Sequence, residues 1–297
     1  MANGENAERT IVVTGATGKQ GGAVARELVR RGFRVRAITR DPSKPAAMAL
    51  GELGIEVLRG DLDDPESLRS PLESAYGVYS VQNFWETGYE REVKQGIALA
   101  ELAKNVGVEH FVYSSVASAQ RETGLSHFES KWKIEEHIRE LDLPYTIFRP
   151  VYFMDNWENP ALREMILGGT LALPLDPDRE LQQVSVLDVG AFVGMAFVDR
   201  ESWLGRELDI AGDEPSMTKT AETFSKVIGR PVSYVQLPWE KYRELAGEEY
   251  TEMMRWFELE GYDADIDVLR ELYPGLTTFE QYLRAHGWQG AGSGVES

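Results

Sequence analysis

One glycine-rich stretch near the start constrains the fold more than any other part of the chain. The strand-like residues 10–13 run into Thr14-Gly15-Ala16-Thr17-Gly18-Lys19-Gln20-Gly21-Gly22, and a helical segment follows at 23–31. A turn of this kind between a strand and a helix is typical of dinucleotide binding. One glycine permits the tight turn, one lets the backbone approach a diphosphate, and one lets helix and strand pack closely. The N–H groups and dipole of the helix start then form an anion site, unless this is simply a glycine-rich turn that binds nothing.

Strand and helix patterns alternate over the first half of the chain. Helical stretches such as 89–106 and 129–141 separate strand-like segments at 34–39, 55–58, 77–81, 110–114 and 145–148. This alternation predicts an α/β fold whose doubly wound, parallel Rossmann sheet is covered on both faces. In such a sheet the ligand binds beyond the carboxyl ends of the strands.

The regular alternation ends near Pro150. We therefore predict a dinucleotide-binding Rossmann domain at 1–150 and a smaller, mixed α/β region at 151–297, partly interleaved with it, that serves a substrate or a partner. The second half contains strand-like segments and helical segments in a less regular order, at 183–186, 189–198, 207–210, 220–228 and 232–235, followed by helical, aromatic-rich residues.

Composition excludes several classes of function. The 297 residues include 31 basic and 49 acidic side chains, and a net charge of −18 would repel nucleic acid and anionic membranes. The chain has no cysteine, so it has no disulfide, thiol nucleophile or thiolate metal site, and no spacing predicts any other metal site. Residues 1–9 lack the apolar region of a signal peptide, and the apolar run 189–198 is too short to span a bilayer. We expect a buried helix at this run and a cytoplasmic protein.

The end of the second strand predicts which dinucleotide binds. An NAD site usually has an acidic residue there, whereas this chain has Arg40, followed by Asp41 and Lys44. A guanidinium can hold a 2′-phosphate with a forked pair of hydrogen bonds, which favours NADP(H). The alternative is that Arg40 is a surface residue and Asp41 binds the ribose of NAD(H). Asp61 follows the third strand and is expected either to meet the adenine edge or to cap the helix near Pro65.

These motifs, in this order, resemble the NmrA-like family, an atypical branch of the short-chain dehydrogenase/reductase superfamily that includes animal redox sensors. The resemblance covers nearly the whole chain. It rests on the glycine-rich turn and on further segments at 39–42, 60–64, 82–86 (Gln-Asn-Phe-Trp-Glu), 92–96 (Glu-Val-Lys-Gln-Gly), 127–131 (His-Phe-Glu-Ser-Lys), 149–156 and 276–283.

The resemblance implies a role in cofactor binding for the matching residues. Residues 15–20 would hold the diphosphate, Arg40 and Lys44 the 2′-phosphate, and Lys131 the nicotinamide ribose. The full implied set is Gly15, Ala16, Thr17, Gly18, Lys19, Gln20, Arg40, Lys44, Asp61 and Leu62 (bordering adenine), Gln82, Asn83 and Phe84 (nicotinamide side), Lys94, Lys131, and Tyr152, Phe153, Met154 and Asp155 (flanking the nicotinamide). At Asp155 the chain departs from the family's asparagine.

The candidate catalytic residues are His127, Lys131 and Ser115. Reductases of the wider superfamily use Tyr-x-x-x-Lys on one helix face, and here His127 takes the place of the tyrosine. The like charges of Lys131 and an oxidised nicotinamide disfavour the protonated form of His127. His127 is therefore a poor proton donor for ordinary carbonyl reduction. Ser114 or Ser115 can orient a carbonyl, or both can simply satisfy backbone groups at a strand end.

Two functions fit these residues. The first is an NADP(H)-binding sensor of dinucleotide redox state that acts on a partner protein. The second is an NADPH-dependent oxidoreductase that acts on a quinone, imine, enone or carbonyl compound. Six aromatic residues either line a substrate pocket over the nicotinamide or belong to the core: Phe84, Trp85, Trp132, Tyr152, Phe153 and Trp157.

Overall fold

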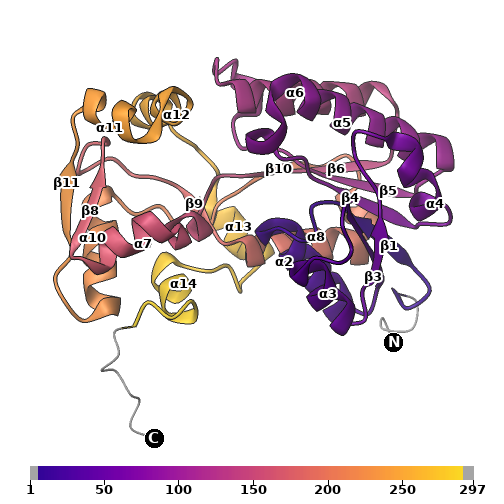
Figure 1. The fold of residues 1–297 in the computed structure, drawn as a ribbon, viewed down its shortest axis with the longest axis horizontal. Helices are drawn as coiled ribbons and strands as arrows, with labels where there is room; N and C mark the ends of the chain where they lie inside the picture. The colour runs from indigo at the N-terminus through magenta and orange to yellow at the C-terminus, as the bar shows by residue number, and fades with distance from the viewer. Residues whose placement is uncertain (1–5, 290–297) are drawn as a thin grey trace, which may run out of the picture. The chain divides into compact units, whose positions relative to one another are not determined.

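The computed structural model describes residues 6–289 and divides into two compact units (Figure 1). The N-terminal unit comprises residues 1–150 and 186–209, and the second unit comprises residues 151–185 and 210–297. Residues 1–5, which belong to the segment 1–9 considered for a signal peptide, and residues 290–297 lie outside the described residues.

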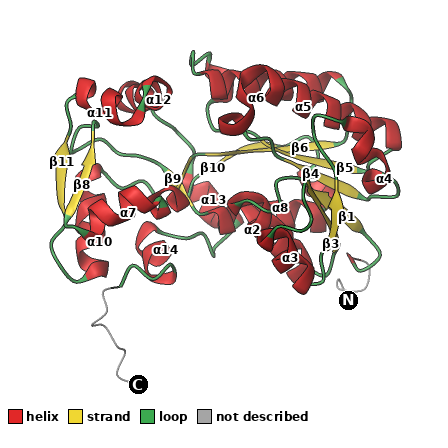
Figure 2. Ribbon diagram, in the orientation of Figure 1, coloured by secondary structure: helices red, strands yellow, loops and turns green. Residues whose placement is uncertain are grey.

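A seven-stranded sheet forms the centre of the N-terminal unit (Figure 2). The strand order is β10-β6-β5-β4-β1-β2-β3, and the five pairs from β6 to β3 are all parallel. Val12, in the middle of β1, pairs with Arg36 of β2 and Val78 of β4. The strands are β1 (Thr10–Val13), β2 (Arg34–Thr39), β3 (Glu56–Arg59), β4 (Gly77–Ser80), β5 (His110–Ser114), β6 (Tyr145–Pro150) and β10 (Glu207–Ile210).

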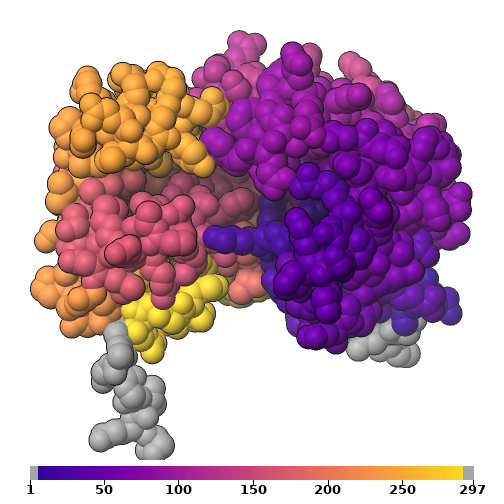
Figure 3. All heavy atoms as spheres, in the orientation of Figure 1, coloured from indigo at the N-terminus to yellow at the C-terminus, as the bar shows by residue number. Residues whose placement is uncertain are grey.

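Helices cover both faces of this sheet, which confirms the predicted α/β class (Figure 1). On one face lie α2 (Lys19–Arg30), α3 (Pro45–Glu52) and α8 (Val186–Val198). On the other lie α4 (Arg69–Leu72), α5 (Phe84–Val106) and α6 (Ser126–Glu140). The atoms of α5 and α6 form much of the upper surface of this unit in Figure 3. Short helices η1 (Pro65–Leu68), η2 (Ala119–Arg121) and α9 (Arg200–Trp203) complete the unit.

Burial explains why these segments take these conformations. Ile11, Val12 and Val13 are fully buried, because a central parallel strand is covered on both faces. The apolar run 189–198 lies in α8, where Val189, Phe192 and Val193 are also fully buried. Among residues 6–289, no helix is both long and apolar enough to cross a membrane.

The structure corrects the starts of several predicted elements. Helix α2 begins at Lys19, four residues before the predicted start, because Gly18 is extended and Gly21 and Gly22 are helical. Helix α5 begins at Phe84 instead of residue 89, because one helical turn precedes a break at Gly88 (φ +73°). The predicted strand at 183–186 is limited to Gln183–Val184, because α8 already begins at Val186.

The second unit contains two small sheets and seven helices among its described residues. Strand β8 (Thr170–Leu173) pairs in parallel with β11 (Ser233–Gln236), and β7 (Tyr152–Phe153) pairs in parallel with β9 (Gln183–Val184). The helices are η3 (Met154–Glu158), α7 (Pro160–Leu167), α10 (Met217–Ile228), α11 (Trp239–Ala246), α12 (Glu248–Leu259), α13 (Ile266–Leu272) and α14 (Phe279–Ala285). Trp157, Phe224 and Phe279 pack together in its aromatic core.

His110 is a buried structural residue, and it makes stability depend on pH. Its Nε2 lies 2.8 Å from Thr146 Oγ1, which itself donates to the Trp203 carbonyl, so Nε2 carries the hydrogen. Burial, and then the charge of Arg200, lower the pKa of His110 from 6.5 to about 3. The folded protein therefore keeps this histidine neutral, while the unfolded chain takes up a proton below about pH 6.5.

We expect stability to fall as the pH drops from about 6.5 toward 3, by about 1 kcal/mol per pH unit from this group. The variant His110→Gln lacks the ionisable ring. In denaturant unfolding at about pH 7 and about pH 4.5, the wild type should lose about 2 to 3 kcal/mol more than this variant. Equal losses would show that His110 is not the source.

Candidate functional site

The glycine turn lies directly after β1, at the carboxyl edge of the sheet. Gly15 has φ +62°, a conformation that favours glycine. A Cβ at Gly21 would lie 2.3 Å from the Gly15 carbonyl oxygen, so helix and turn approach too closely for any side chain. Thr14 Oγ1 donates to the Val81 carbonyl (3.0 Å) and accepts from the Val81 N–H (2.9 Å). These bonds hold the turn against the end of β4.

The start of α2 presents N–H groups without a side-chain cap. Gly18 is the N-cap residue and supplies no side-chain cap hydrogen bond, and the first turn of α2 contains no acidic residue. The N–H groups of a helix start and the helix dipole favour an anion there. The side chain of Gln20 turns away to β5, where its Nε2 donates to Ser114 Oγ at 2.5 Å. The backbone of the turn is therefore suited to a diphosphate.

The residues after β2 form an exposed basic corner. Arg40 Nη2 lies 2.9 Å from Glu86 Oε2, and both side chains are more than half exposed. Asp41 Oδ1 accepts from the Ser43 hydroxyl and N–H, and these bonds lower the pKa of Asp41. Lys44 is exposed at the N-cap of α3. Two cations are thus accessible here, while one oxygen of Asp41 is already engaged within its own loop.

The segment after β3 is held by its own hydrogen bonds. Asp61 Oδ1 accepts from the Asp63 N–H at 3.0 Å, and no side chain caps the short helix η1. The capping role predicted for Asp61 is therefore wrong, because its carboxylate binds the Asp63 N–H, which precedes η1. Leu62 is half-buried against the core.

The end of β4 places a polar and aromatic group next to α5. Gln82 is buried, its Nε2 donates to Ser80 Oγ (3.0 Å), and its Oε1 has no hydrogen-bond partner within residues 6–289. Asn83 caps α5 by accepting from the Trp85 N–H at 3.2 Å. The Phe84 and Trp85 rings lie 5.5 and 5.2 Å from the ring of His127.

Helix α6 brings the two predicted catalytic positions together on one face. His127 is 6% exposed, and Phe84, Trp85 and Phe128 surround its ring. Lys131 lies one turn further along, and its Nζ is 2.6 Å from Oε1 of the fully buried Glu92. The sequence motifs predict no role for Glu92, although it begins the segment 92–96. The sequence feature that could have identified Glu92 is its position one helical turn before Gly96 on α5.

The remaining predicted residues of the N-terminal unit differ in their surroundings. Ser114 Oγ accepts from Gln20, so it does not serve only the backbone. Ser115 is buried, and its Oγ has no partner within the described part of the chain. Lys94 is exposed on α5. Ser115 Oγ and Gln82 Oε1 are thus two buried polar atoms that a ligand could satisfy.

The predicted residues 152–155 belong to the second unit. The Tyr152 ring packs 5.7 Å from Trp157 and 6.1 Å from Phe257, and burial raises the pKa of its hydroxyl. Met154 is fully buried, Asp155 is nearly so, and Phe153 is half-buried. Trp157 is fully buried in this aromatic core. Trp132 lies on α6 in the N-terminal unit, beneath the guanidinium of Arg139.

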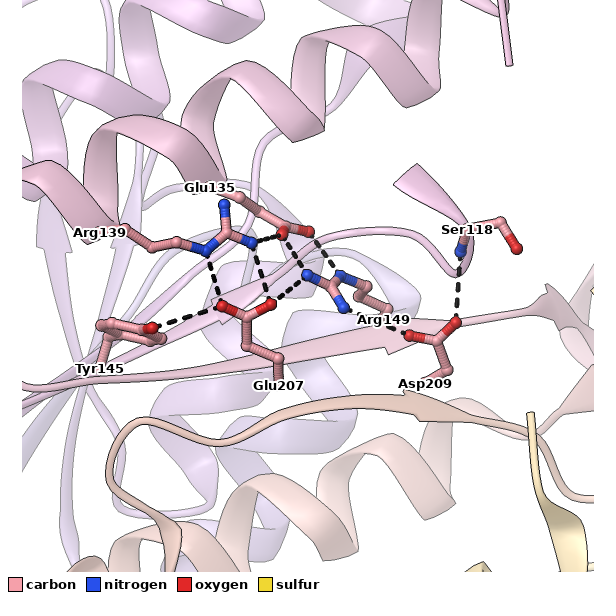
Figure 4. Close-up of polar contacts among 7 residues, drawn as sticks. All are labelled: Ser118, Glu135, Arg139, Tyr145, Arg149, Glu207 and Asp209. Atoms are coloured by element: carbon pink, nitrogen blue, oxygen red, sulfur yellow. Dashed lines mark hydrogen bonds and ion pairs between the residues drawn. The ribbon is translucent and has the colours of Figure 1, made fainter. Parts of the chain in front are cut away.

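A cluster of charges joins α6 to the edge of the sheet (Figure 4). Glu135 is fully buried and accepts from Arg149 Nε (2.8 Å) and Arg139 Nη2 (2.7 Å). Glu207 of β10 bonds to both guanidinium groups, and Asp209 lies 3.7 Å from Arg149. Burial opposes the charge of Arg149, but the hydrogen bonds and charge of Glu135 outweigh it and raise the pKa of Arg149. This cluster fixes the helix that carries His127 and Lys131.

Comparisons with known proteins agree with this fold. The model of the NmrA-like family matches residues 7–283. The oxidoreductase hkm9 of Aspergillus hancockii, an NmrA-like family domain-containing protein, is 31% identical over 262 residues, covering 79% of this chain and 77% of its own. NmrA, a negative transcriptional regulator solved in complex with NAD, superposes with a TM-score of 0.78 at 24% identity over 93% of this chain and 94% of its own. Triphenylmethane reductase of Citrobacter, solved with NADP(H), superposes with a TM-score of 0.79 at 22% identity, over 93% of this chain and 99% of its own.

Proposed function

The chain belongs to the NmrA-like family, and on this premise we propose that it binds NADP(H) and reports the redox state of that dinucleotide. The observation that carries the proposal is the glycine turn after β1. Its helix starts without a side-chain cap, and a Cβ at Gly21 would collide with the Gly15 carbonyl. NmrA, solved with NAD, and triphenylmethane reductase, solved with NADP(H), share the fold.

The residues of this chain fit the parts of such a cofactor. The backbone of residues 15–20 would hold the diphosphate, and Arg40 with Lys44 would hold the 2′-phosphate. Lys131 would donate to the nicotinamide ribose. The resemblance assigns the adenine side to Asp61 and Leu62, and within the N-terminal unit it assigns the nicotinamide side to Gln82, Asn83, Phe84 and Lys94. The bound dinucleotide would supply hydride transfer.

The surroundings of His127 support a sensor. In reductases of the wider superfamily a tyrosine at this position passes a proton to a carbonyl. Here His127 takes its place, and the rings of Phe84, Trp85 and Phe128 enclose the imidazole. A sensor needs the cofactor to bind one conformation better than another. The helical turn 84–87, which Gly88 separates from the rest of α5, is a segment whose position cofactor binding could change. Its partner would be a regulated protein.

Ser115 favours a second function, an NADPH-dependent oxidoreductase. Its buried Oγ, which has no partner in the described chain, could orient a quinone, imine, enone or carbonyl oxygen. A related chain, hkm9, is named an oxidoreductase. NADPH oxidation with a panel of these compounds separates the two functions. Turnover that is lost in Ser115→Ala and Lys131→Met supports the enzyme, and binding without turnover supports the sensor.

Arg40 provides the test of cofactor choice. The variant Arg40→Gln should weaken NADPH binding by about tenfold or more, because a charge-assisted bond to the 2′-phosphate is lost. NADH binding should change little, because NADH has no 2′-phosphate. Dissociation constants from isothermal titration calorimetry check this. Unchanged NADPH binding by Arg40→Gln, or tighter binding of NADH than of NADPH by the wild type, would contradict this role of Arg40. Either result would favour Asp41 as the residue that binds the ribose of NAD(H).

Glu86→Gln is the matched control for this variant. It removes the carboxylate that pairs with Arg40 but keeps the guanidinium. Because an exposed ion pair contributes little, NADPH binding should tighten by no more than about fivefold. Weaker binding in this variant would contradict a role for Arg40 in holding the phosphate.

A further inference from the structure

Glu92 is a fully buried carboxylate between α5 and α6. Its Oε1 accepts from Lys131 Nζ at 2.6 Å, and its Oε2 accepts from the Ser130 hydroxyl. Lys131 is 14% exposed. A buried carboxylate without a cation would cost several kcal/mol, so burial at this position requires the Lys131 partner.

Close helix packing fixes this pair in place. Gly96 lies one turn after Glu92 on α5, and a Cβ there would lie 2.5 Å from the Ile134 side chain of α6. The missing side chain lets the two helices approach closely. Ile134 in turn lies one turn after Ser130 and Lys131. The carboxylate and the ammonium therefore meet across a rigid helix pair, with no mobile loop between them.

The position of Lys131 gives this pair a function. Its ammonium has three donors, one of which bonds to Glu92. We infer that Glu92 is a positioning residue that aims Lys131 and neutralises its charge, and thereby sets how well the site accepts NADP⁺ relative to NADPH. This inference rests on the proposed function, in which Lys131 contacts the nicotinamide ribose.

The physical reason is the charge of the oxidised ring. The nicotinamide of NADP⁺ carries a positive charge, and that of NADPH does not. An uncompensated Lys131 would repel the oxidised form alone, while the Glu92–Lys131 pair is neutral overall. Glu92 thus removes a repulsion that would act on the oxidised form alone, and so sets the affinity for NADP⁺ relative to NADPH.

The test compares the ratio of the NADP⁺ and NADPH dissociation constants in wild type and Glu92→Gln, at constant pH and salt. Gln keeps the shape of the side chain and an oxygen for Lys131, but removes the charge. We expect NADP⁺ to weaken about threefold to tenfold more than NADPH. Loss of a purely structural contact would weaken both forms equally and leave the ratio unchanged, which would overturn the inference.

Three further variants make the result specific. Glu90→Gln removes an exposed carboxylate from the same helix, and Ser130→Ala removes a bond to Glu92 without changing its charge. Both should keep the wild-type ratio. Glu92→Gln combined with Lys131→Gln leaves no buried charge and should restore the ratio, even if both forms bind more weakly. Failure to restore it overturns the inference. Wild-type protein that binds neither form would instead overturn the proposed function, and this inference with it.

Discussion

Gly21→Ala should abolish NADP(H) binding, weakening it by about a hundredfold or more, which corresponds to about 3 kcal/mol. The added Cβ would lie 2.3 Å from the Gly15 carbonyl oxygen and 2.8 Å from the Thr14 carbonyl oxygen. Both contacts are with backbone, so no side chain can move to relieve them. Either α2 must move from the turn or the turn must open, and in both cases the N–H groups no longer converge on a diphosphate. The overpacking should also cost about 1 to 3 kcal/mol of stability.

Gly51→Ala is the control for this substitution. Gly51 lies within α3, and a Cβ there meets no atom within 4 Å. The same chemical change should raise the free energy of unfolding by about 0.5 to 1 kcal/mol and leave cofactor binding unchanged. Isothermal titration with NADPH and denaturant unfolding measure both effects. Normal NADPH binding by Gly21→Ala would contradict the assignment of the turn as the diphosphate site.

Arg149→Met should lower the free energy of unfolding by about 3 to 5 kcal/mol. The guanidinium is 8% exposed and compensates Glu135, which is fully buried, together with Glu207 and Asp209. Its removal leaves the buried Glu135 carboxylate with Arg139 as its one cationic partner among residues 6–289. Because α6 is tied to the sheet through this cluster, we also expect weaker NADPH binding (Figure 4).

The control is Lys241→Met, which breaks the ion pair of Lys241 with Glu244. Both side chains of that pair are more than half exposed, so the change in stability should stay within about 0.5 kcal/mol. Denaturant unfolding of the two variants gives the comparison. A loss below about 1 kcal/mol for Arg149→Met would show that the cluster does not hold the unit together.

The sequence predicts the central sheet well because local patterns determine it. Buried apolar runs such as Ile11-Val12-Val13 identify strands, and the glycine turn identifies the carboxyl edge where a ligand binds. The sequence pattern places the start of α2 too late because Gly21 and Gly22 are poor helix formers. Their helical conformation depends on tertiary packing against the turn, which propensity does not capture.

The charged pairs could not be predicted in the same way. Glu92 and Lys131 are 39 residues apart, and they meet only because Gly96 lets α5 approach Ile134 of α6. Glu135, Arg149 and Glu207 come from a helix and two strands that adjoin only in the folded sheet. Such contacts depend on how helices and strands pack against one another, and the periodicity within one element does not predict them.

The most direct test of cofactor binding is a calorimetric titration of the purified protein with NADPH, with NADH in parallel. We predict a saturable heat for NADPH, tighter binding than for NADH, and a rise in melting temperature on addition of NADPH. Absence of both heat and thermal protection at about 1 mM NADPH, equivalent to binding weaker than about 4 kcal/mol, would contradict the assignment of this fold to a nicotinamide dinucleotide.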